Sequence, residues 1–117
     1  MEGRAALLAK VVRYELPLEE TLLMLSAFGW DSDEELYQLS GQDVIALLDR
    51  YLEGALTAAQ VQHWAELLEM RDDVGFEVKQ TDLLKQIIFR LANPEVNRTI
   101  TRTLAVEIQA QLIEEAS

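Results

Sequence analysis

Apolar side chains recur at intervals of three and four residues along most of the chain, the spacing of one face of an α-helix. Leu7, Leu8, Val11 and Val12 form such a stripe near the N-terminus, whereas strand-like alternation is scarce. The pattern predicts helices over residues 4–14, 18–28, 42–53, 57–70, 81–91 and 103–114. Their expected core positions include Leu18, Leu22, Leu25, Phe28, Val44, Ile45, Leu48, Tyr51, Leu52, Val61, Trp64, Ala65, Leu68, Leu83, Leu84, Ile87, Ile88, Leu91, Leu104, Ile108 and Leu112.

Residues that start or stop helices stand at the ends of several of these ranges. Ser40 can cap the helix that follows it, and Thr57 with Gln60 forms a capping-box pattern. Gly54 is placed to end the helix before it. These signals agree with the periodicity, so both predict the same boundaries.

Two connectors contain acidic residues and lack a clear periodicity. The first acidic connector, residues 30–40, could form a short helix capped by Ser32, with Glu35 completing a capping box, or an extended segment; we favour the short helix. The second acidic connector, residues 71–80, is expected to be a loop in which Gly75 takes a left-handed turn.

No internal repeat, low-complexity tract or Pro/Gly/Ser-rich linker divides the chain. The simplest expectation is a single helical domain over residues 1–117. We predict an all-α fold, a compact irregular bundle of five to six amphipathic helices.

Acidic residues are concentrated in the middle of the chain. The 117 residues carry a formal net charge of −11. Residues 15–77 hold 15 acidic and two basic side chains, a net −13, and the remainder carries a net +2. This balance argues against direct binding to nucleic acid and favours basic partners.

Several classes of protein are excluded or disfavoured. The chain has no cysteine, which excludes disulfides, thiolate metal sites and cysteine nucleophiles. The N-terminus lacks the apolar segment of a signal peptide, and the longest uncharged stretch, residues 54–65, is shorter than the ~20 residues that span a bilayer. We therefore expect a cytoplasmic protein without membrane contact.

Candidate catalytic and metal-binding motifs are incomplete. The run that begins at Asp31 starts like a calcium-binding loop, but Leu36 and Gln42 stand where an EF-hand needs glycine and glutamate. His63, the one histidine, lacks the spacing of a di-iron site, and no serine lies in a Gly-x-Ser-x-Gly motif. We predict no enzyme, cofactor or metal, and a surface or half-buried His63 beside Trp64.

Trp30 and Phe76 differ from the other aromatic residues because they lie in the two acidic connectors. Aromatic side chains among acids are typical of the anchors of a protein interface. The alternative, which is the default for aromatic side chains, is that both pack the connectors onto the bundle.

Five stretches carry a family resemblance: Val12–Leu18, Trp30–Leu36, Leu47–Gly54, Trp64–Glu77 and Phe89–Glu95. Together they resemble a group of small helical bacterial proteins that includes immunity proteins of contact-dependent growth inhibition and related polymorphic-toxin systems. The resemblance spans about residues 12 to 95 and brings no catalytic residues with it.

The resemblance implies a protein that binds and neutralises a toxin C-terminal domain delivered by a neighbouring cell. Such toxins are often nucleases, whose basic surfaces an acidic inhibitor can occupy. Our own hypothesis places the interface on the two connectors, at Trp30, Asp31, Asp33, Glu34, Glu35, Asp72, Asp73, Phe76 and Glu77.

Two other classes of function stay open. One is a helical adaptor or regulatory homodimer without a toxin partner, joined through an apolar helix face. The other is a metal- or ligand-dependent enzyme centred on His63 and nearby carboxylates, against which full activity of a His63→Ala variant would argue.

Overall fold

The computed structural model describes residues 3–15, 18–25, 37–71 and 74–116. The all-α prediction is confirmed, with one small addition of β-structure. The elements, in order, are α1 (Arg4–Arg13), α2 (Leu18–Leu25), β1 (Tyr37–Leu39), α3 (Gly41–Leu52), α4 (Ala58–Met70), β2 (Val74–Phe76), η2 (Val78–Gln80, a 3₁₀ turn), α5 (Thr81–Ala92) and α6 (Arg102–Ala116).

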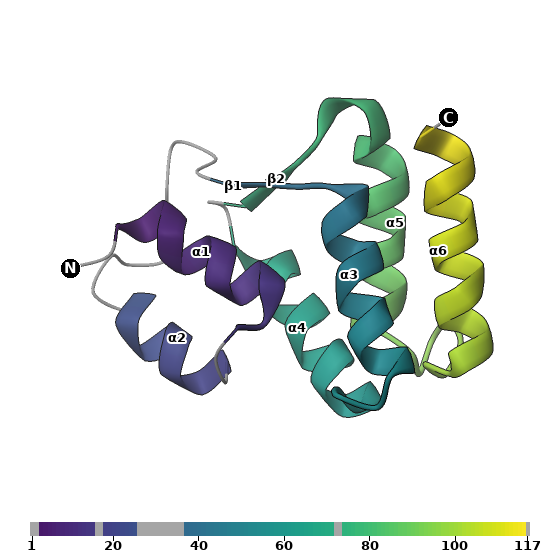
Figure 1. Ribbon diagram of the computed structural model, residues 1–117, viewed down its shortest axis with the longest axis horizontal. Coiled ribbons are helices and arrows are strands. Elements are labelled where there is room, and N and C mark those ends of the chain that lie inside the picture. The colour runs from purple at the N-terminus through teal and green to yellow at the C-terminus, as the bar shows by residue number, and fades with distance from the viewer. Residues whose placement is uncertain (1–2, 16–17, 26–36, 72–73, 117) are drawn as a thin grey trace.

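The helices pack as three neighbouring pairs around one hydrophobic core. α4 packs along α5, α3 packs along α6, and α1 packs against α2. Figure 1 shows α1 and α2 at one end of the molecule and α5 and α6 at the other, with β1 and β2 running between them. α1 is joined to the rest through contacts with α3 and β1.

The predicted start signals are present as hydrogen bonds. The Ser40 hydroxyl accepts from the Asp43 backbone N–H at 3.1 Å, and Asp43 accepts in return from the Ser40 N–H. Thr57 and Gln60 form the same reciprocal pair at the start of α4. Both capping boxes satisfy N–H groups that have no partner inside the helix.

The predicted core is largely confirmed. Trp64 is fully buried, and its indole N–H donates to the Val12 backbone oxygen at 3.1 Å, which ties α4 to α1. Five of the predicted core residues are half-buried instead of buried: Leu22, Ile45, Tyr51, Leu52 and Leu83. Phe28 lies outside the described residues. Leu39 is buried, as the extended alternative for the first connector expected. The pattern missed buried Leu56 and Ile100, which lie outside the helices and so have no helical spacing to mark them, and it also missed Leu47 and Leu67.

The two acidic connectors differ from expectation. The helix favoured for residues 30–40 is wrong over Tyr37–Leu39, which form β1, while residues 30–36 lie outside the described part. The loop expected over residues 71–80 contains β2 and the 3₁₀ turn η2. The strands pair in parallel, Tyr37 with Val74 and Leu39 with Phe76, and each gains backbone hydrogen bonds that a lone strand lacks.

The expectation of a left-handed turn at Gly75 is also wrong, because this glycine lies in β2 opposite Gln38. Gly54 does adopt a left-handed conformation, with φ of 86°, directly after the α3 C-cap residue Glu53. Tyr14 adopts one as well, with φ of 53°, and there it ends α1.

Candidate functional site

Most of the interface predicted on the two connectors lies outside the described residues. This holds for Trp30, Asp31, Asp33, Glu34, Glu35, Asp72 and Asp73. Only Phe76 and Glu77 can be placed, and both are involved in the packing of the second connector.

Phe76 is half-buried at the end of β2 and packs against the core. Phe76 also lines an open cleft of about 560 Å³ between the end of α4 and α5, together with Met70 and Lys85. One side of the ring thus supports the fold while the side chain still reaches the surface.

Glu77 uses its carboxylate inside the fold. Its Oε1 accepts from the Gly41 backbone N–H at 3.0 Å, at the positive N-terminal end of α3. Its own backbone N–H donates to the Leu39 oxygen at 2.9 Å, which extends the contact between β1 and β2. Glu77 therefore holds the second connector against the start of α3.

The β-pairing brings β1 of the first acidic connector and β2 of the second together. Tyr37 and Val74, the first described residues after residues 26–36 and 72–73, are partners in register. Because the strands are parallel, the chain enters both of them from the same end. The chain thus enters β1 and β2 at neighbouring points, although Tyr37 and Val74 are far apart in the sequence.

The acidity of the middle of the chain remains at the surface. Its exposed acids in the described part are Glu15, Glu19, Glu20, Asp49, Glu53, Glu66 and Glu69. The two basic residues of the same segment neutralise little of this negative surface charge. Arg71 is only 5% exposed, and Arg50 donates to the backbone oxygens of Arg13 and Tyr14.

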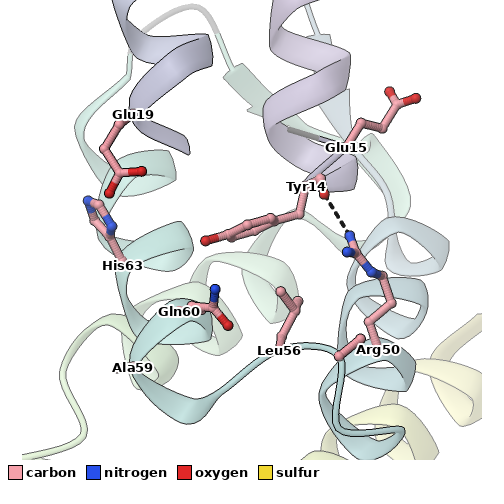
Figure 2. Close-up of a pocket in the computed structure, with 9 residues that line it drawn as sticks. Tyr14, Glu15, Glu19, Arg50, Leu56, Ala59, Gln60 and His63 are labelled. Atoms are coloured by element: carbon pink, nitrogen blue, oxygen red, sulfur yellow. Dashed lines mark hydrogen bonds between the residues drawn. The ribbon is translucent and has the colours of Figure 1, made fainter. Parts of the chain in front are cut away.

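A second candidate site is an open cleft of about 450 Å³ where the end of α1 meets α2, α3 and α4. It is absent from the interface hypothesis, but it contains His63, on which the enzyme alternative is centred. We call it the Tyr14 cleft. Figure 2 shows the Tyr14 ring extending across it, with Glu19 and His63 facing each other beyond the hydroxyl and Arg50 at the opposite end. The residues that line it are Tyr14, Glu15, Glu19, Arg50, Ala55, Leu56, Ala59, Gln60 and His63.

Neighbouring groups hold both the backbone and the ring of Tyr14 in place. Its backbone N–H donates to oxygens of the last turn of α1, and the Arg50 guanidinium donates to the Tyr14 oxygen at 2.7 Å. The Arg50 guanidinium carbon also lies 5.8 Å from the centroid of the Tyr14 ring, within the range of a cation–π contact. The ring therefore has a defined position in the cleft.

The pKa of the Tyr14 hydroxyl is raised above its ordinary value. The main cause is partial burial, and the negative charge of Glu19 adds to it. A hydrogen bond with the Gln60 side chain and the positive charge of Arg50 act in the opposite direction. The hydroxyl thus stays protonated at neutral pH and can donate a hydrogen bond.

The sequence held weak signals of the Tyr14 cleft. Arg50 is one of two basic residues in the acidic segment, and His63 is the one histidine of the chain. His63 is exposed, as expected for a surface histidine beside Trp64. What the sequence could not show is that α1, α2 and α4 bring Tyr14, Glu19 and His63 together.

Within the described ranges, no group of three or more histidine or acidic side chains is arranged to hold a metal ion. In the same part of the chain, no helix has both the length and the apolar character needed to cross a bilayer. Comparison of the chain with protein families, with curated proteins and with solved structures finds no match.

Proposed function

We propose that this protein is an immunity protein that binds and neutralises a toxin domain with a basic surface, such as a nuclease domain. The resemblance of residues 12–95 to immunity proteins of contact-dependent growth inhibition suggests the role. The exposed acidic residues in the middle of the chain would be complementary in charge to the basic surface of such a toxin domain.

The observation that carries the proposal is the register of β1 and β2. In this register β1 of the first acidic connector pairs with β2 of the second. The acids Asp31, Asp33, Glu34, Glu35, Asp72 and Asp73 precede the two strands in the sequence. We propose that the acids of both segments act on the same partner, and their combined field would be stronger than that of either segment alone. Such a field accelerates association with a basic protein and disfavours wrong partners.

Purification of the tagged protein from its own cells at low salt tests the proposal. We expect a basic toxin C-terminal domain to co-purify and to be released only at high salt or in denaturant, because ion pairing is screened by salt. Recovery of the protein alone, from cells in which the toxin is demonstrably expressed, would contradict the proposal.

A charge-matched pair of variants locates the interface once that partner is in hand. Replacement of Asp33, Glu34, Asp72 and Asp73 by alanine should weaken binding of the toxin domain and reduce its salt dependence. The control removes the same charge elsewhere, at the exposed residues Asp82, Glu95, Glu114 and Glu115. Equal affinity of the two variants would exclude the connectors as the interface.

One observation favours the second candidate, a homodimeric adaptor. Val106 and Ile113 are 53% and 58% exposed on α6, on the face opposite the buried Leu104, Ile108 and Leu112. Such an apolar stripe could pair with a second copy, although a charge of −11 on each copy opposes association. A mass that rises with concentration, without a toxin partner, would support this candidate.

A further inference from the structure

We propose that the Tyr14 cleft receives one lysine or arginine side chain of the bound partner. The cationic group would lie at the Glu19 end, and the aliphatic stem would lie along the Tyr14 ring. That the occupant belongs to a protein partner rests on the proposed function, whereas the preference for a cation rests on the cleft itself.

The Glu19 end of the cleft supplies a carboxylate and neutral polar groups. Glu19 is exposed in the first turn of α2, and Figure 2 shows its carboxylate turned toward the imidazole of His63. The amide of Gln60 and the hydroxyl of Tyr14 complete this end. A guanidinium or an ammonium group could bind the carboxylate directly and use the Tyr14 hydroxyl oxygen as a further acceptor. The Gln60 Oε1 is not available to it, because this oxygen accepts from the Thr57 backbone N–H at 2.8 Å.

Arg50, the one cationic side chain that borders the cleft among the residues that the structure describes, does not cancel this charge. The Arg50 Nη1 donates to the Arg13 oxygen at 2.9 Å and to the Tyr14 oxygen at 2.7 Å. These bonds hold its guanidinium beside the backbone, at the end of the ring away from Glu19 (Figure 2). An anionic ligand would have to compete with two backbone oxygens for Arg50 and would meet Glu19 at the other end.

The Tyr14 ring provides the surface for the stem of a long basic side chain. Lysine and arginine bury their methylene groups along apolar surface while the charged group reaches polar partners. The buried side chain of Leu56 also lines the cleft. A volume of about 450 Å³ is in the range of sites for small ligands, so one side chain fits where a whole helix would not.

The proposal can be tested without the partner, by titration of the protein with N-acetyl-arginine amide. His63 is the one histidine, so its imidazole C–H signals in a proton NMR spectrum are assigned at once and report directly on the cleft. We expect a saturable shift of these signals and of the Tyr14 ring signals. The neutral isostere N-acetyl-citrulline amide should produce no saturable shift, because it lacks the charge that Glu19 binds.

Two variants with the same change of charge separate the cleft from the general acidity of the protein. Glu19→Gln should weaken binding of the arginine probe about fivefold, which is the loss of affinity expected when one ion pair at the protein surface is removed. Glu69→Gln, on α4 but outside the Tyr14 cleft, should bind as the unmodified protein does. Equal affinity of the two variants, or equal binding of the citrulline probe, would overturn the proposal.

Other outcomes distinguish this proposal from the immunity function. A saturable shift with sodium acetate but not with the arginine probe would make the cleft an anion site and would overturn the proposal. Binding of the arginine probe as expected, with no toxin domain co-purifying from cells that express it, would refute the immunity function alone. A captured toxin domain whose affinity is the same for Glu19→Gln and Glu69→Gln would refute the cleft as part of the interface.

Discussion

Tyr14 ends α1 in a backbone conformation that glycine usually supplies. At φ 53° and ψ 45°, a residue with a Cβ atom costs about 1–2 kcal/mol. The hydrogen bonds of its N–H to the last turn of α1 and of its oxygen to Arg50 offset that cost. A glycine would remove the strain but also the ring, and it is the ring that crosses the cleft.

Tyr37 gives a prediction at the same scale, since its hydroxyl donates to Asp43 Oδ2 at 3.0 Å. Burial raises the pKa of Tyr37, and the negative charge of Asp43 and this hydrogen bond raise the pKa further. An unfolded tyrosine loses its proton near pH 10, while the folded one retains it, so stability should fall as pH rises from about 10 to the folded pKa.

At neutral pH the Tyr37→Phe variant should be less stable than the unmodified protein by about 1 kcal/mol, because it lacks the hydrogen bond to Asp43. Between about pH 10 and the folded pKa of Tyr37, its stability should fall less steeply with pH. Urea unfolding at a series of pH values measures both quantities. A decline as steep as that of the unmodified protein would show that Tyr37 does not contribute to the pH dependence.

At the scale of elements, helices were predictable and the strands were not. Each helix has an apolar stripe over several turns, and Ser40 and Thr57 mark two of the starts. β1 and β2 have three residues each, too few to display alternation, and each is stable only because the other lies beside it. The Tyr14 cleft was missed for the same reason, because separate elements contribute Tyr14, Glu19 and His63.

Gly41 tests how closely α3 packs against the 3₁₀ turn η2. A Cβ atom at this position would lie 2.6 Å from Oε1 of Gln80. Gln80 is buried and donates to the Leu112 oxygen at 3.2 Å, so it cannot move aside freely. Gly41→Ala should therefore lower the free energy of unfolding by about 1–3 kcal/mol, although helix propensity alone favours alanine.

Gln42→Ala, at the exposed position next to it, is the matched control and should change stability by less than about 0.5 kcal/mol. Chemical denaturation of both variants measures the difference. If Gly41→Ala is as stable as the control, the approach of α3 to η2 is looser than the structure indicates.

For the whole molecule, the net charge of −11 favours binding and opposes folding. Like charges repel within the compact state, and salt screens that repulsion. The same salt screens attraction to a basic partner. Stability of the free protein and affinity for the partner should therefore respond to salt in opposite directions.

Sodium chloride should raise the thermal unfolding midpoint of the isolated protein over the range in which the Debye length falls from ~30 Å to ~8 Å. Scanning calorimetry at several salt concentrations measures the trend. A midpoint that stays constant or falls would mean that local ion pairs, such as Arg98 with Glu107, outweigh the repulsion.

The parallel pair of β1 and β2 has a thermodynamic consequence for recognition. α3 and α4 lie between the two strands in the chain, so the strand pair closes residues 37–76 into one unit. A partner that binds beside one strand and stabilises the pair would therefore also hold the other strand in its binding position. Six strand residues would in this way make two distant parts of the sequence bind as one cooperative unit.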